Sequence, residues 1–168
     1  MTGDAPAGQF VAEVERSGGD YDGFNLVVAD RHSLHYCASR TDSAVELAPG
    51  IYGISNHFLD TPWPKLTQAK RNFQRAISAR QPSLPEIFAL LADASQAPEN
   101  ELPDTGVGID WERKLSSIFI ASPEYGTRAS TIVLFHRDGG IRFYERSFGT
   151  NGEFLGEVDV MSPWRSTL

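Results

Sequence analysis

The chain has 168 residues, a formal net charge of −7 and a hydrophobic fraction of 40%, which is typical of one soluble globular domain with its own core. The acidic balance argues against general nucleic-acid binding and against electrostatic attraction to anionic membranes. No apolar run approaches the roughly 18 residues that span a bilayer, so we expect no transmembrane segment. The N-terminus lacks a signal-peptide pattern and Cys37 is the single cysteine, so a cytoplasmic protein without disulfides is expected.

The first third of the sequence predicts a helix followed by a hairpin. Residues 1–8 are small and polar and are expected to be a disordered start. Helical spacing predicts a short helix over 9–16, and apolar runs predict strands over 24–30 and 34–39. Cys37 has no basic neighbour that would lower its pKa, so we interpret it as structural. His32 and His35 do not converge on a turn and a strand, so no metal site is expected.

The stretch 47–65 combines turn residues with a polar triplet. Pro49-Gly50 predicts a turn, and residues 51–54 predict a short strand interrupted by Gly53. This strand would deliver Asn56, whose side-chain amide offers the donors that oxyanion stabilisation requires. The alternative is that Asn56 only ties down the turn before Asp60, because Asn is among the commonest turn residues.

The remaining sequence predicts helices and antiparallel strands. Helices are expected over 62–80 and 85–93, the second with a capping box at Ser83 and Glu86. The basic residues of the first helix are interpreted as a solvated face. A long loop over 94–107 precedes a helical turn at 111–115. Strands are expected over 116–121, 129–136, 141–148 and 154–160, with a hairpin turn at Asp138-Gly139 and a loose tail from Ser162.

Arg128 lies at the mouth of the strand predicted over 129–136. An arginine there could clamp a carboxylate or hold a nucleophile in register. The alternative is a surface ion pair with Glu124 or Glu145. Phosphate-binding loops, dinucleotide fingerprints, zinc-protease motifs and serine-hydrolase elbows are absent from the sequence. These patterns alone indicate an α+β domain with a polar strand end.

Three stretches resemble signatures of the NRDE family, also called the transport and Golgi organisation protein two family. Residues 50–56 with 59–65 resemble its central signature, residues 125–131 its C-terminal signature, and residues 21–26 with 39–40 the intervening hairpin. They occur in the family's order, and the resemblance covers about residues 10–160. The family's N-terminal Met-Cys and Asn-Arg-Asp-Glu segment is not found here. We therefore expect residues 1–168 to form a single but partial domain that lacks the family's N-terminal third.

The resemblance implies an αββα sandwich of antiparallel sheets, as in N-terminal-nucleophile hydrolases. In the similar cysteine acylases an N-terminal cysteine attacks an amide and its own amine serves as the base. Asn56, after Ser55, matches the position of the oxyanion-donating asparagine, and Arg128 matches an arginine that lines the site. These two residues are expected to share a pocket as supporting catalytic groups of an amidohydrolase that acts on non-peptide C–N bonds. The nucleophile is absent from this sequence, because Cys37 is internal and has no free α-amine.

Two other interpretations stay open. The first is a non-catalytic binding or trafficking module for a hydrophobic ligand such as haem or lipid. Ser55, Tyr52, His57 and Trp63 would then line the ligand site, with His57 as an axial ligand of haem. The second is a domain completed by a partner chain, either a second copy or the missing N-terminal segment, because the missing third would leave a sheet edge unpaired.

Overall fold

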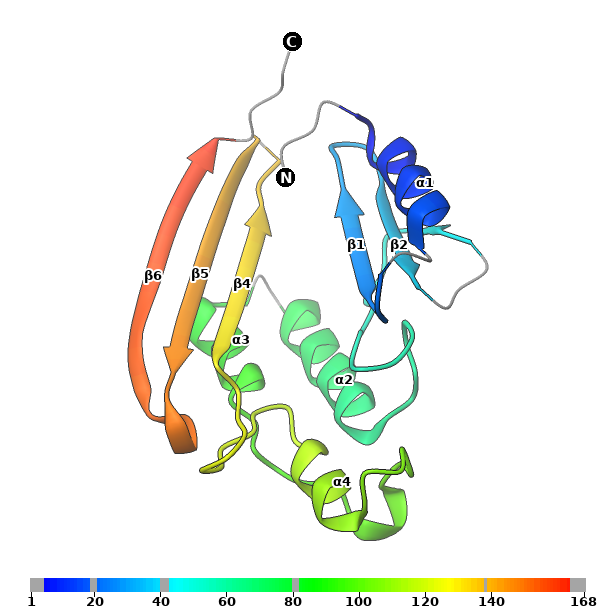
Figure 1. Ribbon diagram of the computed structural model, residues 1–168. Coiled ribbons are helices and arrows are strands. Elements are labelled where there is room, and N and C mark those ends of the chain that lie inside the picture. The colour runs from blue at the N-terminus through cyan, green and yellow to red at the C-terminus, as the bar shows by residue number, and fades with distance from the viewer. Residues whose placement is uncertain (1–4, 19–20, 40–42, 80–81, 138, 164–168) are drawn as a thin grey trace. The chain divides into compact units, whose positions relative to one another are not determined.

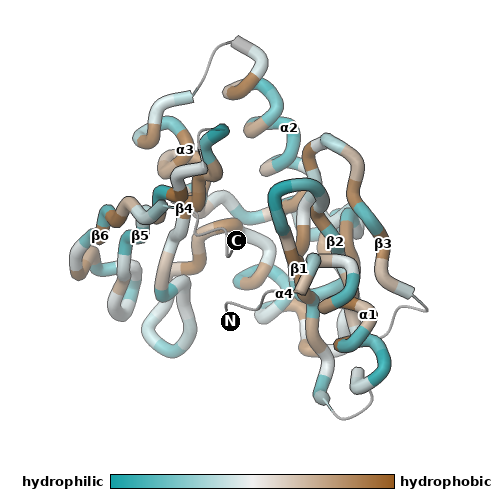
Figure 2. The backbone as a smooth tube through the Cα atoms, turned by 90° about the horizontal axis from the view of Figure 1, so that it is seen from above, coloured by the Kyte–Doolittle hydropathy of each residue, from teal (hydrophilic) through white to brown (hydrophobic). Residues whose placement is uncertain are grey.

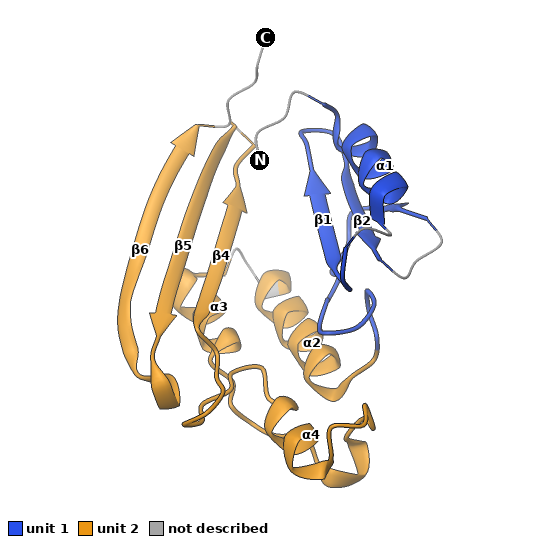
Figure 3. Ribbon diagram, viewed as in Figure 1, with its two compact units in different colours: residues 1–61 blue, residues 62–168 orange. Residues whose placement is uncertain are grey.

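The computed structural model describes residues 5–18, 21–39, 43–79, 82–137 and 139–163 (Figure 1). The chain divides into two compact units, residues 1–61 and residues 62–168 (Figure 3). Each unit contains one antiparallel three-stranded sheet in the described residues, with helices packed beside it. The fold is therefore mixed α and β, in agreement with the predicted α+β class.

Unit 1 is a helix packed on a small sheet. Its elements are α1 (Ala7–Ser17), β1 (Asn25–Ala29), β2 (Leu34–Ala38) and β3 (Val45–Glu46), and the strand order is β1-β2-β3. In the hairpin Asn25 pairs with Ala38 and Ala29 pairs with Leu34. The α1 helix packs mainly on β2, and Val11 and Cys37 are fully buried. The helix and the hairpin were predicted from the sequence and are confirmed.

Asp30 ties the start of α1 to the turn between β1 and β2. Its Oδ2 accepts a hydrogen bond of 2.9 Å from the backbone N–H of Ala7, the first residue of α1. Its Oδ1 accepts from the backbone N–H groups of His32 at 2.7 Å and Ser33 at 2.8 Å, which form the hairpin turn. The pKa of Asp30 is well below its ordinary value because these backbone hydrogen bonds stabilise the carboxylate. One side chain therefore caps α1 and shapes the turn between β1 and β2.

Unit 2 combines helices with a longer sheet. Its helices are α2 (Pro64–Ala79), α3 (Leu84–Leu91), α4 (Ile109–Leu115) and the short 3₁₀ segments η2 (Glu99–Glu101) and η3 (Thr150–Gly152). Its strands are β4 (Ala129–Phe135), β5 (Gly140–Phe148) and β6 (Phe154–Pro163), in the order β4-β5-β6. Hydrophobic and hydrophilic residues alternate along α2 (Figure 2), as expected of an amphipathic helix.

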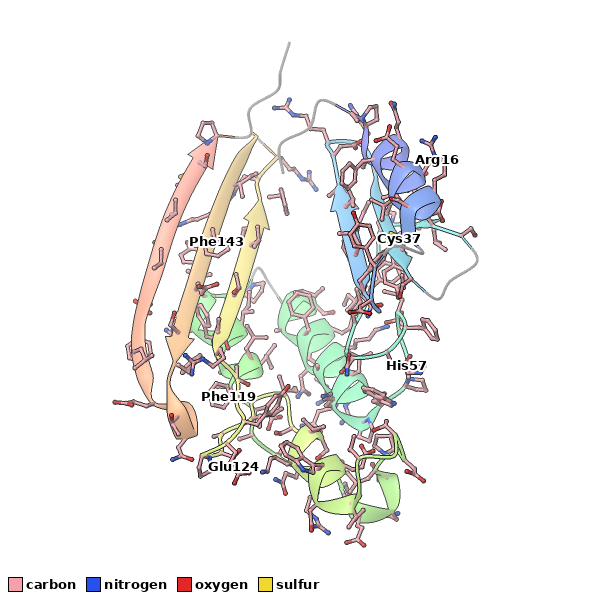
Figure 4. All side chains as sticks on the ribbon, in the orientation of Figure 1. Arg16, Cys37, His57, Phe119, Glu124 and Phe143 are labelled. Carbon is pink, nitrogen blue, oxygen red and sulfur yellow. The ribbon has the colours of Figure 1, made fainter. Side chains whose placement is uncertain are left out.

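The core of unit 2 lies between α3 and one face of its sheet. Phe88 from α3 contacts Ile132 and Tyr144, which are directly paired on β4 and β5. The guanidinium of Arg146 lies 4.0 Å from the ring centre of Phe88 and covers this core. Because strand side chains alternate between faces, the opposite face carries a separate apolar set, which stays exposed within the unit. Its larger members are Val133, Phe135, Phe143, Val158 and Val160, and Figure 4 shows Phe143 on β5.

Two predicted strands are wrong. Residues 51–54 are irregular, because the backbone of Gly53 pairs with Asp60 across a loop rather than with a neighbouring strand. Residues 116–121 are also irregular, although Ser116, Ser117 and Phe119 are buried. There the backbone N–H of Phe119 donates to the carbonyl of Asp93, and Ile120 pairs with Thr127; these are contacts with loop residues rather than the ladder of a strand. Both segments are as apolar as a strand, but in the described residues neither pairs with a neighbouring strand.

Other boundaries also differ from the expectation. Ala7 and Gly8 belong to α1 rather than to a disordered start, and the rest of that predicted start lies partly outside the described residues. Ser162 and Pro163 extend β6 instead of forming a loose tail. Parts of four predicted features lie outside the described residues. They are residues 164–165 of the tail, residue 80 of the helix, residue 40 of the hairpin signature and residue 138 of the turn. Among the described helices, none combines the length and apolar character that crossing a bilayer requires.

Candidate functional site

The central signature folds into a closed loop in unit 1. Asp60 closes it: its backbone N–H donates to the carbonyl of Gly53 at 2.8 Å, and its Oδ1 accepts from the N–H of Gly53 at 2.8 Å. Asp60 has a φ of 56°, a left-handed conformation that Asp tolerates better than most residues. The loop presents residues 54–59 at its outer bend, and Asn56 lies among them.

The hydroxyl of Tyr36 fastens this loop to the hairpin. The backbone N–H of Leu59 donates to the Tyr36 hydroxyl at 3.1 Å, and that hydroxyl donates to Oδ1 of Asn25 at 2.6 Å. Tyr36 itself is buried, and both hydrogen bonds are partly buried. Because Oδ1 of Asn25 accepts this bond, its Nδ2 keeps two donors for other partners.

A hollow of about 280 Å³ lies between the start of β1, the end of β2 and the loop. Ser39 holds its edge, where its Oγ accepts from the N–H of Phe24 at 3.1 Å and its own N–H donates to the Phe24 carbonyl at 3.2 Å. The hollow brings two side-chain amides, one hydroxyl, two phenyl rings and one imidazole to one place. It is lined by Gly23, Phe24, Asn25, Ala38, Ser39, Asn56, His57 and Phe58.

Asn56 is exposed at this hollow, and its side chain has no hydrogen-bond partner within the part of the chain that the structure describes. The turn that Asn56 was alternatively expected to hold is held by other residues. Asp60 closes the loop, and the hydroxyl of Thr61 donates to the carbonyl of Phe58 at 2.9 Å. The amide of Asn56 therefore has no role in fixing the turn.

His57 follows Asn56 in the sequence and also lines the hollow; Figure 4 shows His57 on its loop. Its Nδ1 lies 2.8 Å from Oγ1 of Thr61, within hydrogen-bonding distance. The ring also packs edge to face against Phe58, with 4.7 Å between ring centres. Both contacts fix the orientation of the imidazole at the rim of the hollow.

The other predicted ligand-binding residues do not line this hollow. Tyr52 folds back on its own turn, where its hydroxyl donates to the carbonyl of Ala48 at 2.9 Å and its ring covers Gly50. A Cβ at Gly50 would lie 3.1 Å from that ring, so the glycine allows the close approach. Ser55 is half-buried within the loop. Trp63 belongs to unit 2, where the ammonium of Lys65 lies 5.8 Å from its ring centre.

Arg128 lies in unit 2, one residue before β4, and its side chain is exposed. Its carbonyl accepts from the N–H of Phe148 at 2.9 Å, which anchors the backbone at the start of the sheet. Among the described residues neither expected acidic partner forms an ion pair with it, and Glu145 instead accepts from the hydroxyl of Thr131 at 2.8 Å. Glu124 lies on the loop before β4 (Figure 4). That Arg128 shares a pocket with Asn56 stays a prediction.

The C-terminal signature has a structural reason for its Gly and Thr. A Cβ on Gly126 would lie 2.9 Å from the carbonyl oxygen of Ile120, so only glycine fits there without a shift. Thr127 then pairs twice with Ile120: its N–H donates to the Ile120 carbonyl at 2.8 Å, and its Oγ1 accepts from the Ile120 N–H at 2.9 Å. These contacts fix the backbone that presents Arg128.

Cys37 is unsuited to nucleophilic chemistry. It is 2% exposed in the middle of unit 1, and burial raises the pKa of its thiol, with the nearby charge of Glu15 as a second cause. A raised pKa keeps the thiol protonated near neutral pH, whereas the thiolate is the reactive form. The interpretation of Cys37 as a structural residue is confirmed.

The sequence analysis missed Asn25, Phe24 and Ser39 as site residues. They were read as parts of a hairpin, because a strand residue gives no sign of which loop approaches it. The available signal was their place in the hairpin signature, since residues 21–26 and 39 stand in it together. The structure brings these signature positions and Asn56 to one hollow.

Comparisons with known proteins agree with the signatures. The model of the family described as Transport and Golgi organisation 2 matches residues 1–150. The chain is 35% identical over 162 aligned residues to the Transport and Golgi organization protein 2 homolog of Bos taurus and 34% identical to that of Homo sapiens. It is 31% identical to the Transport and Golgi organization 2 homolog of Mus musculus. Each alignment covers 88% of this chain but 58% of the relative, so the chain spans little more than half of their length. With the family model matched over most of its residues, the chain belongs to the Transport and Golgi organisation 2 family.

Proposed function

We propose that unit 1 carries the carbonyl-binding part of an amide-hydrolysing site of the N-terminal-nucleophile type. The observation that carries the proposal is the amide of Asn56, which is exposed at the hollow and has no partner in the described residues. Asn25 adds a second amide whose N–H donors are not used by Tyr36. Side-chain amides of this kind stabilise the oxyanion that forms when an acyl carbon is attacked.

The proposed chemistry needs a cysteine that Cys37 does not supply. In the proposed reaction, an N-terminal cysteine, provided by the Met-Cys segment of the family, loses its thiol proton to its own α-amine and attacks the amide carbon. The oxyanion would accept hydrogen bonds from Asn56. As it collapses, the C–N bond breaks and the amine leaves with that proton, and water then hydrolyses the thioester to a carboxylic acid. The αββα stacking of sheets and a clamping role for Arg128 belong to the same proposal.

The test measures hydrolysis of a short-chain acyl p-nitroanilide by the chain, alone and with a Met-Cys-containing segment of the family added. We expect p-nitroaniline release only with the segment, and Asn56→Ala should lower kcat by about 10²–10³-fold with little change in KM. Asn72→Ala is the matched control, because Asn72 lies on α2 and outside the hollow. No release with the segment present, or equal rates for both variants, would reject the proposal.

A second candidate function is the carriage of a hydrophobic ligand such as haem or lipid. A second hollow, a groove of about 930 Å³, lies between α1 and β1 and shares Phe24 and Asn25 with the first; its volume suits a small organic ligand. Most of its lining is apolar, and it includes Phe10, Val14, Tyr21, Leu26 and Val27. This groove, rather than the predicted set of Tyr52, Ser55, His57 and Trp63, favours such a function.

Haem titration followed by the Soret band separates the two locations. Val27→Asp would place a charge in the groove, while Val45→Asp places one on an equally exposed strand position outside it. We expect the first variant to weaken binding and the second to leave it unchanged. If His57→Ala alters the Soret spectrum and Val27→Asp does not, haem binds at His57 rather than in the groove. If haem produces no Soret change with the unmodified chain, haem is rejected as the ligand.

A further inference from the structure

Unit 2 contains a hollow of about 480 Å³ that the proposed hydrolase site does not use. It is lined by residues of α2, by residues of the segment 93–98, and by Ser116 and Ile118. Its volume falls in the range of small-molecule sites in proteins. Prolines 62, 64 and 98 give it apolar surface beside its charged groups.

Lys65 is the first charged group of this hollow. It is half-buried in the first turn of α2, where the helix dipole disfavours a cation. Its ammonium donates one hydrogen bond of 2.7 Å to the carbonyl of Leu115 at the end of α4. An ammonium has three donors, and in the described residues no carboxylate pairs with it. Burial lowers the pKa of Lys65, the expected result for a cation without an anionic partner.

Arg71 is the second cation. Residues 65, 68 and 71 follow one another at steps of three along α2, so they share one side of the helix and all line the hollow. The guanidinium of Arg71 is exposed and has no ion pair within the described ranges. Its fork of N–H groups matches the two oxygens of a carboxylate.

The two acidic residues of the hollow, Asp93 and Glu101, differ in their hydrogen-bond partners and exposure. Asp93 accepts from Nε2 of Gln68 at 2.8 Å and from the N–H of Ser95 at 2.9 Å, and the Ser95 hydroxyl also donates to it. These bonds, those of Ser95 first, lower the pKa of Asp93, so it stays an anion. Glu101 is exposed at the rim. Asp93 therefore already has its donors, whereas the ammonium of Lys65 and the guanidinium of Arg71 keep N–H groups that an anionic acceptor would satisfy.

We propose that this hollow binds a small organic monocarboxylic acid, with its carboxylate between Lys65 and Arg71 and its apolar body against the prolines. Two cations facing two anions favour a singly charged ligand over a phosphate dianion, which Asp93 and Glu101 would repel. This proposal is independent of the hydrolase site, because every group it uses lies in unit 2.

The probes are butyrate, the isosteric neutral butyramide and inorganic phosphate, titrated into the full ¹⁵N-labelled chain. We expect butyrate to shift the amide signals of Ala97 and Ser116 in a saturable way and butyramide to leave them unchanged. Equal binding of butyramide would refute the need for a carboxylate. Saturable binding of phosphate alone would refute the organic acid as the ligand.

Charge-removing variants locate the site. Arg71→Gln should weaken butyrate binding about fivefold, the effect of an exposed ion pair, and Arg75→Gln, one turn further along α2 and outside the hollow, should not. Lys65→Met should weaken it about tenfold or more, because its ammonium is half-buried. Lys65 also holds the end of α4, so thermal unfolding is measured on each variant. Loss of butyrate binding in Lys65→Met with no effect of Arg71→Gln would overturn the proposed carboxylate position.

Discussion

Asp30 should control the stability of unit 1, because three backbone N–H groups from two elements converge on its carboxylate. A hydrogen bond contributes about 1 kcal/mol net, and more to a charged acceptor, but solvent reduces the effect at a partly exposed site. We expect Asp30→Ala to lower the free energy of unfolding of unit 1 by about 2 kcal/mol. This corresponds to a fall of roughly 1–2 M in the urea midpoint for a unit of this size.

Cys37 supplies the assay for this prediction. It is the single cysteine of the sequence and is buried in unit 1, so pulsed thiol labelling in urea reports the unfolding of that unit. Asp22→Asn is the matched control, because Asp22 is an exposed carboxylate of the same unit and no hydrogen bond to its side chain is found in the described residues. A midpoint lowered equally by both variants would show that net charge, and not the contacts of Asp30, sets the stability.

The pH dependence follows from the direction of the pKa shift. The pKa of Asp30 in the folded chain lies below the ordinary value of 3.8, so near that pH the unfolded state binds more protons than the folded state. The stability that Asp30 contributes is therefore present above about pH 5 and falls as the pH approaches 2. The difference in unfolding free energy between the unmodified chain and Asp30→Asn should shrink over that window. A difference that stays constant between pH 3 and pH 7 would refute this account.

Three further substitutions test residues with a structural role, and Asn56→Ala serves as the contrasting variant in the last of these tests. Gly126→Ala should destabilise unit 2 by about 1–3 kcal/mol in thermal unfolding, because the new Cβ meets the backbone carbonyl of Ile120 at 2.9 Å; an unchanged midpoint would show that the loop yields. Ser83→Ala should cost about 1 kcal/mol by removing the capping box of α3, measured by urea unfolding. Asp60→Ala should speed hydrogen exchange at the Gly53 amide at least about tenfold, whereas Asn56→Ala should leave that rate unchanged; equal effects would assign Asn56 a structural role.

The elements that the sequence predicted well are those whose signal is local. The β-rich runs over 129–136 and 141–148, separated by an Asp-Gly turn signal, predicted β4 and β5 within one residue. The capping box at Ser83 and Glu86 predicted the start of α3, and both of its reciprocal bonds are present. Such patterns depend on neighbours along the chain, which the sequence contains in full.

The failures come from contacts between distant residues. Residues 51–54 and 116–121 are apolar enough for strands, but whether a partner strand lies beside them is decided elsewhere in the chain. β3 has two residues and leaves almost no pattern in the sequence. Lys65 was interpreted as part of a solvated basic face, yet it is half-buried and reaches the carbonyl of Leu115, 50 residues away. The correction applies to Lys65 and to Lys70, which is also half-buried, whereas Arg71 and Arg75 are exposed as predicted.

Within the loop that closes at Asp60, most polar groups have a structural task. Asp60 pairs with Gly53, Thr61 binds both Phe58 and the ring of His57, and Leu59 is fastened by Tyr36. Asn56 is the contrasting case, because the described residues satisfy neither its amide N–H groups nor its oxygen while it borders a hollow. Its exposed amide offers two N–H donors and an acceptor to any ligand that enters the hollow. The proposed carbonyl-binding site therefore depends on Asn56, because its amide has no hydrogen bond in the described residues while its neighbours are hydrogen-bonded within the loop. Asn56 is for this reason the first residue to test.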